Sequence, residues 1–116
     1  MPLPSEEPTA PSAEAAKWLG IVEDQTKDIQ DRIKAVYEPE QLKEPATAER
    51  LIKLLPGNYD AFTFRIVVAL EQIESPQALP LLKKMYNEEN IDIPGKIRVA
   101  LEGAIRACGG DPNDPK

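Results

Sequence analysis

The 116-residue sequence contains no histidine and a single cysteine, Cys108. Without histidine, the chain lacks the commonest metal ligand and the commonest general base of proteins. One cysteine excludes a disulfide within the chain. Aromatic residues make up only 5% of the sequence, and no glycine-rich phosphate-binding loop is present. These absences argue against an enzyme, and we expect neither a cofactor nor a metal site.

Long hydrophobic runs are also missing, and the mean hydropathy is -0.41. A membrane-spanning helix needs roughly 20 consecutive apolar residues, and no segment reaches that length. The first residues carry neither the basic segment nor the apolar segment of a secretory signal. We therefore expect no membrane association and a cytoplasmic location.

Basic residues are outnumbered, since 14 Lys and Arg against 20 Asp and Glu give a net charge of -6. Nucleic-acid binding draws on clustered Lys and Arg that neutralise phosphates. Nucleic acid is therefore disfavoured as a partner. The negative charge either serves solubility or has a specific role, such as mimicry of nucleic acid toward a basic protein.

Proline is concentrated at the N-terminus, at Pro2, Pro4, Pro8 and Pro11. Such a composition neither forms a helix nor buries an apolar face, so residues 1–11 are predicted to be a disordered tail. Glycine and proline recur after Cys108 and predict a second disordered tail over residues 109–116. A chain of this size has room for one core, which assigns residues 12–108 to a single all-helical domain.

Apolar spacing predicts about five helices. The first is the longest, over residues 12–37, with Ser12 as its N-cap and an end before Pro39. Apolar residues four and seven apart form a short heptad seam along it. We expect this helix to pack onto the rest of the domain, because an isolated coiled coil of this length is marginal.

Four further helices are predicted between residues 45 and 108. Pro45 opens the second, and residues 59–73 form a third that is apolar around most of its circumference and therefore central. Ser75 caps the fourth, over residues 76–87, where Pro80 should kink or tighten the first turn. The fifth begins at residue 95 and carries Cys108 on its apolar stripe, which predicts a core cysteine.

One internal repeat is present. The segment Arg65–Glu71 (RIVVALE) matches Lys96–Glu102 (KIRVALE) at an offset of 31 residues, with five of the seven positions identical. Repeats of this length are typical of helical solenoids, in which successive helix pairs stack and reuse one apolar pattern. The sequence therefore predicts an all-α fold, either a short α-solenoid or a helical bundle.

The segments Phe64–Ile73 (FRIVVALEQI) and Ser75–Leu82 (SPQALPLL) resemble a HEAT-type repeat, closest to the short HEAT-like repeats of the phycobilisome-lyase class. Those repeats pair a helix containing an Arg and an Ala-Leu step with a second helix opened by Asp or Ser, Pro and Ala, often with another proline. The resemblance covers residues 45–108 and implies HEAT-like hairpins. The residues Ile93-Pro94-Gly95 replace the usual acidic turn, and tetratricopeptide stacking remains the alternative.

This resemblance implies a non-enzymatic protein–protein interaction module, acting as an adaptor, assembly factor or complex subunit. In HEAT-like proteins the second helix of each pair lines a concave surface that binds partners. The matching segments here are residues 45–55 and 76–87, whose outward residues are candidates for binding an acidic partner, or else solvated faces of amphipathic helices. These candidates are Arg50, Lys53, Lys83, Lys84 and Asn87.

Trp18 and Tyr37 lie near opposite ends of the predicted first helix and are either interface anchors or core residues. The alternative function is an acidic chaperone or inhibitor, phage-like or secretion-related, that engages a basic partner surface. An apolar solenoid end normally needs a cover, so a homodimer or an obligate protein partner is expected at the last or first helix.

Overall fold

A computed structural model describes residues 11–55, 58–88 and 92–113 of the chain. This part is all-helical, as predicted, and none of its residues belongs to a strand. No helix in it is long and apolar enough to cross a membrane. The predicted tail residues 1–10 and 114–116 lie outside the described residues. The elements are α1 (Ala13–Glu23), α2 (Ile29–Ala35), α3 (Tyr37–Leu42), α4 (Pro45–Ile52), α5 (Ala61–Ile73), the 3-10 turn η1 (Pro76–Ala78), α6 (Leu79–Tyr86) and α7 (Gly95–Ala107).

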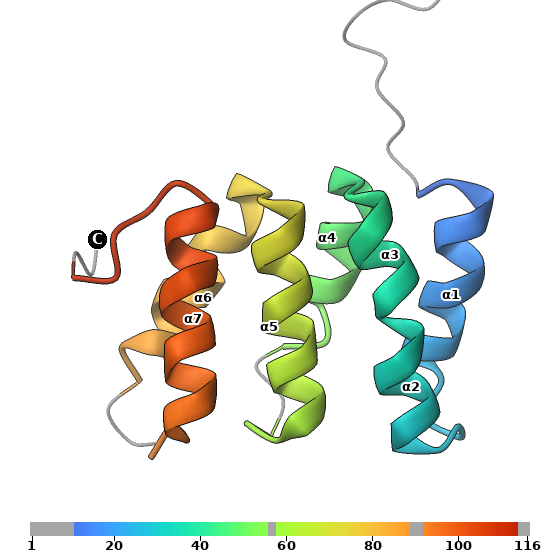
Figure 1. Ribbon diagram of the computed structural model, residues 1–116, viewed down its shortest axis with the longest axis horizontal. Helices are drawn as coiled ribbons and strands as arrows, with labels where there is room; N and C mark the ends of the chain where they lie inside the picture. The colour runs from blue at the N-terminus through green and yellow to red at the C-terminus, as the bar shows by residue number, and fades with distance from the viewer. Residues whose placement is uncertain (1–10, 56–57, 89–91, 114–116) are drawn as a thin grey trace, which may run out of the picture.

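The helices are arranged in a row two layers deep (Figure 1). A front layer consists of α2–α3, α5 and α7, which lie side by side, while α4 and α6 lie behind them and α1 closes one end of the row. Helix α5 packs against α3 on one side and α7 on the other. Its buried residues, which confirm its predicted central place, are Thr63, Ile66, Val67, Ala69, Leu70 and Ile73.

The single helix predicted over residues 12–37 is wrong, because α1 ends at Glu23 and the chain turns back. Ser12 caps α1 as predicted, since its hydroxyl accepts a hydrogen bond from the Ala15 N–H at 3.2 Å. The predicted seam does not continue across the turn: Val22 is fully buried, whereas Ile29 is 41% exposed.

Two aspartates make this turn. Asp24 Oδ1 accepts hydrogen bonds from the Thr26 N–H at 2.9 Å and the Thr26 hydroxyl at 2.6 Å. Asp28 Oδ1 then accepts from the Gln30 N–H at 3.2 Å and caps α2. These carboxylates offer the backbone local partners that compete with helix hydrogen bonds, so the helix stops and restarts.

Pro39 was predicted to end the first helix but lies inside α3. Proline has no N–H, and its ring crowds the carbonyl four residues earlier, which belongs to Ala35. The chain tightens at Val36, whose N–H donates to Ile33 O at 3.3 Å, only three residues back. As a result α2 and α3 follow one another with a kink, and Lys43 ends α3 with a φ of 53°.

The remaining helices lie close to their predicted positions. Pro45 is the first residue of α4, and Asp60 caps α5 by accepting from the Thr63 N–H at 3.1 Å. Pro80 lies in the first turn of α6, directly after η1, which is the tightened start that the sequence predicted. Ser75 makes no capping hydrogen bond with its side chain, contrary to prediction.

The packed chain continues past Cys108, where the sequence predicted that order stops. Gly109 has a φ of 97°, and the Gly110 N–H donates to Ile105 O at 2.8 Å. This is the hydrogen bond of a Schellman motif, which closes the end of α7. Gly110 has no room for a side chain, because a Cβ there would lie 2.5 Å from Leu79 Cδ1. Gly110 is half-buried and Pro112 is buried, so the chain still contacts the domain after Cys108, while Gly109, Asp111 and Asn113 are exposed.

The 31-residue offset extends further than the segment found from the sequence. In the rear layer it relates Leu51 to Leu82, both fully buried. In the front layer it relates Ala35, Ile66 and Ile97, which are all buried on α2, α5 and α7. The offset thus aligns the kinked pair α2–α3 with α5 in the sequence, and α5 and α7 run in the same direction (Figure 1).

Candidate partner-binding surfaces

Trp18 and Tyr37 lie together on the surface, not at opposite ends of one helix. Because the chain turns back between α1 and α2, both side chains line one hollow of about 430 Å³. Trp18 is half-buried and Tyr37 is 52% exposed. Rigid aromatic side chains within a polar rim are typical anchors of protein interfaces. The other lining residues are Ile21, Lys27, Asp31, Lys34, Ala35 and Glu38.

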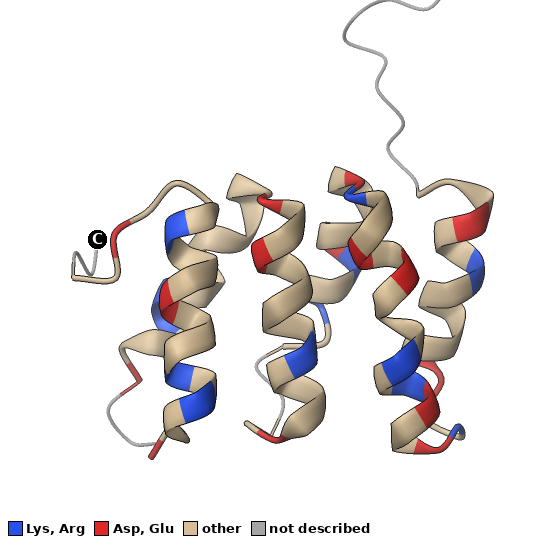
Figure 2. Cartoon of the chain, in the orientation of Figure 1, with Lys and Arg blue, Asp and Glu red and all other residues tan. Residues whose placement is uncertain are grey.

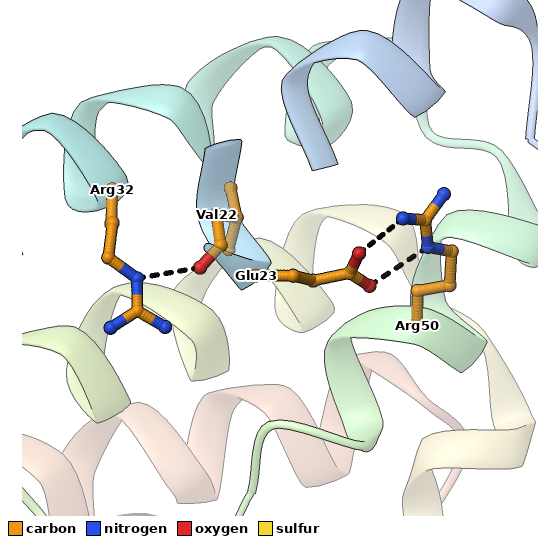
Figure 3. A network of polar contacts seen from close by, with 4 residues as sticks. All are labelled: Val22, Glu23, Arg32 and Arg50. Carbon is orange, nitrogen blue, oxygen red and sulfur yellow. Dashed lines mark hydrogen bonds and ion pairs between the residues drawn. The ribbon is translucent and has the colours of Figure 1, made fainter. Parts of the chain in front are cut away.

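Two arginines fix the end of α1 beside this hollow (Figure 3). Arg32 Nε donates to Val22 O at 2.8 Å, which satisfies a carbonyl at the C-terminus of the helix. Arg50 Nε donates to Glu23 Oε2 at 2.9 Å, and Arg50 Nη2 pairs with Glu23 Oε1. The hydrogen bond to Glu23 raises the pKa of Arg50. Together these contacts tie α1 to α2 and α4 and so keep Trp18 in place.

Only some of the residues predicted on the rear helices to bind an acidic partner are exposed on the surface. Arg50 is already paired with Glu23, although its side chain is still partly exposed. Lys53 and Lys84 are exposed at equivalent positions 31 residues apart, whereas Lys83 is half-buried. Asn87 Nδ2 donates to Lys83 O at 2.9 Å. Lys53, Lys84 and Asn87 are thus the exposed members of the predicted set, and Asn87 already uses its Nδ2 within the chain.

The front layer carries the same pattern three times: a basic residue, an apolar residue three positions later and an acidic residue three positions after that. Figure 2 shows basic segments in the upper part of α2 and in the lower halves of α5 and α7, with acidic segments above each of them. The exposed apolar positions of this order are Tyr37 on α3 and Val99 on α7, which is 66% exposed. The three sets are Lys34-Tyr37-Glu40, Arg65-Val68-Glu71 and Lys96-Val99-Glu102.

Between α3 and α5 the opposite charges of this order meet. Arg65 Nη2 lies 2.9 Å from Glu40 Oε1, and Glu40 is 6% exposed. The contact is an ion pair, and Glu40 Oε1 makes no hydrogen bond. This pair bridges α3 and α5.

Between α5 and α7 the equivalent residues, Glu71 and Lys96, form no ion pair with one another in the described chain. Lys96 Nζ instead lies 4.4 Å from the centroid of the Phe64 ring. The Glu71 carboxylate lies over Gly103, with Oε2 3.0 Å from where a Cβ would be. The result is an open groove of about 630 Å³, here called the α5–α7 groove, with Val99 on its wall.

Sequence reasoning missed the groove residues Val68, Val99 and Glu102. The signal that could have found them is the 31-residue offset itself. Extending it one step back from Arg65–Glu71 aligns that segment with Lys34–Glu40 and places Tyr37, Val68 and Val99 at one position. A recurring apolar residue outside the buried positions of a repeat indicates a shared surface.

The described residues contain no group of three or more acidic or cysteine side chains that could hold a metal ion. Cys108 is 3% exposed, and burial raises the pKa of its thiol to about 11. A buried thiol that stays protonated at neutral pH is a poor nucleophile and a poor metal ligand. The hollows on the described surface include the one at Trp18 and Tyr37 and the α5–α7 groove. No known protein family, curated protein or solved structure matches this chain.

Proposed function

We propose that the protein is a non-enzymatic protein–protein interaction module, built as a short solenoid of HEAT-like hairpins and acting as an adaptor, assembly factor or complex subunit. The stacking part of the proposal is supported by the 31-residue offset, which relates buried positions in both layers. Solenoid repeats contact their neighbours and reuse the same buried positions. The parallel course of α5 and α7 agrees with such a repeat (Figure 1).

The observation that carries the binding function is the hollow that holds Trp18 and Tyr37. Tyr37 leaves 52% of its surface exposed beside a second aromatic residue, so a partner gains a large apolar contact there. Lys34 and Glu38 on the rim offer groups of both charges to polar residues of the partner. The partner we propose is a protein segment that inserts an apolar side chain into this hollow, with Lys53 and Lys84 as a second contact for acidic residues.

The test is affinity capture from a lysate of the source cells at low and high salt. Tyr37→Ala removes the exposed ring, and Val99→Ala is the matched control, because Val99 is 66% exposed and lines neither this hollow nor the one that holds Lys53. We expect a partner that the wild type and Val99→Ala retain at high salt and that Tyr37→Ala loses. The purified partner should also change the fluorescence of the single tryptophan, Trp18.

The other outcomes distinguish the alternatives. A partner bound equally well by Tyr37→Ala would contradict the hollow as the binding site. Partners that are lost with added salt would favour the acidic chaperone or inhibitor, since salt screens contacts between exposed charges. That function would rest on the net charge of -6 rather than on the aromatic hollow.

A further inference from the structure

On the exposed side of α7, a basic and an acidic residue lie at equal distances on either side of Val99. Lys96 lies three residues before Val99 and Glu102 three residues after it. Gly95 lies four residues before it and Gly103 four residues after it. Residues three and four apart share one side of a helix, and all five line the α5–α7 groove. From start to end these five residues read Gly, Lys, Val, Glu, Gly, and Ala100 and Arg106 of α7 line the groove beside them.

A helix with this order is complementary to an antiparallel copy of itself. A two-fold axis through Val99 sets Val99 against its own copy and Lys96 against Glu102 of the partner subunit. Because contacts across a two-fold axis occur twice, the Lys–Glu contact is made on both sides of the centre. The same axis sets Gly95 at the height of Gly103 of the partner subunit. Neither glycine adds a side chain of its own, but within each chain the Glu71 carboxylate already covers Gly103.

We propose that the protein forms a two-fold symmetric homodimer in which α7 packs antiparallel against α7 of a second copy, over the α5–α7 groove. Val99 is suited to the centre, because 66% of an apolar side chain is exposed there. Gly95 allows close approach, since no atom lies within 4 Å of where its Cβ would be. Phe64 and Val68, both half-buried, add apolar surface from α5.

Charge complementarity selects a second copy as the occupant of the groove. The net charge of -6 makes two copies repel at long range, yet the groups that meet at this contact have opposite signs. The dimer goes beyond the proposed function and does not depend on it. The hollow at Trp18 and Tyr37 shares no lining residue with the groove and stays free for a different partner.

The first test is the mass in solution by light scattering, over a dilution series from about 1 mM to about 1 µM. We expect the wild type to approach twice its 12.8 kDa chain mass at the highest concentrations. Val99→Asp sets two like charges against each other at the centre and should raise the dimer dissociation constant at least about tenfold. Ile29→Asp, at an apolar site that is 41% exposed and outside the groove, should leave it unchanged.

A wild-type mass of one chain throughout the series overturns the proposal. So does a Val99→Asp variant that dimerises as tightly as the wild type, since this variant keeps the fold while altering the centre of the contact. Circular dichroism verifies that fold. Partner capture by monomeric Val99→Asp then tests the proposed function separately, because Tyr37 is unchanged.

The second test is of the antiparallel register. Lys96→Glu leaves only acidic groups at the two charged positions, and Glu102→Lys leaves only basic ones. Each variant should lose at least about tenfold in homodimer affinity, and an equimolar mixture should form the heterodimer, in which every contact is again between opposite charges. Tyr86→Phe is the control for Glu102→Lys, because the Tyr86 hydroxyl donates to Glu102 at 2.6 Å. A mixture in which no heterodimer forms overturns the register.

Discussion

At the residue scale, Cys108 illustrates how burial, with a smaller contribution from the charge of Glu74, sets the chemistry of a side chain. Burial raises the pKa of its thiol from 9.0 to about 11. Between these two pH values the folded state holds a proton that the unfolded state releases. The unfolding free energy is therefore undiminished below pH 9 and falls as the pH rises toward 11.

We expect Cys108→Ala to remove this part of the alkaline loss of stability. The measurement is the free energy of unfolding by urea at several pH values for both proteins. Tyr59 and Tyr86 also have raised pKa values, through burial and through the hydrogen bond to Glu102 respectively, so only the difference between wild type and variant reports on the thiol. Equal pH profiles for the two proteins would contradict the prediction.

Thr47 carries a buried polar group without a partner. The residue is fully buried, and its hydroxyl makes no hydrogen bond. Its counterpart 31 residues later is Ala78, which is also buried and has no polar side-chain atom. Valine keeps the shape of threonine without the hydroxyl, so Thr47→Val should raise the free energy of unfolding by about 1 kcal/mol.

Urea denaturation followed by circular dichroism checks the Thr47→Val prediction. Thr26→Val is the control and should not raise the free energy of unfolding, because the Thr26 hydroxyl is exposed and already donates to Asp24 at 2.6 Å. A Thr47→Val protein that is less stable than the wild type would mean that the hydroxyl has a partner after all.

At the element scale, the sequence predicted α5 and α7 well and residues 12–37 poorly. For α5, the apolar face and the capping Asp60 agree on one helix. Between residues 24 and 28 these signals conflict. The apolar spacing continues in the sequence, whereas Asp24 and Asp28 accept hydrogen bonds from nearby backbone N–H groups. Apolar periodicity takes no account of that competition. The meeting of Trp18 and Tyr37 depends on the turn, so it could not be predicted either.

The capping role of Asp28 is open to a direct test. Its carboxylate accepts from the Gln30 N–H at the start of α2. Removing an N-cap costs about 1 kcal/mol, so Asp28→Ala should lower the free energy of unfolding by about that amount. Gln25→Ala, at an exposed position of the same turn, is the matched control and should have little effect. Equal stability of Asp28→Ala and the control would show that the turn holds without the cap.

At the scale of the whole molecule, the two candidate surfaces lie on helices at opposite ends of the row (Figure 1). The proposed dimer uses α7, whereas the proposed partner site uses α1 to α3. A dimer of this kind would present two Trp18–Tyr37 hollows. A partner with two suitable segments would then gain avidity from the effective concentration of the second site.

The same two ends allow a test of whether the row folds as one unit. Trp18 on α1 reports by fluorescence, and Cys108 after α7 reports by its accessibility to a thiol reagent. Helix α5 packs against both α3 and α7 and so couples the two ends. For a single domain of this size we expect one cooperative transition, and therefore the same urea midpoint from both probes and from circular dichroism.

The measurement is best made on Val99→Asp, because dimer formation would otherwise make the midpoint depend on protein concentration. Cys108→Ala supplies the background of the thiol assay. If Cys108 became reactive at a lower urea concentration than that at which Trp18 fluorescence changes, α7 would be opening on its own. In that case the contacts between neighbouring helices would be too weak to join the row into one cooperative unit. Coincident midpoints would instead mean that a partner bound at Tyr37 stabilises α7 as well, since binding to the folded state alone shifts the whole transition.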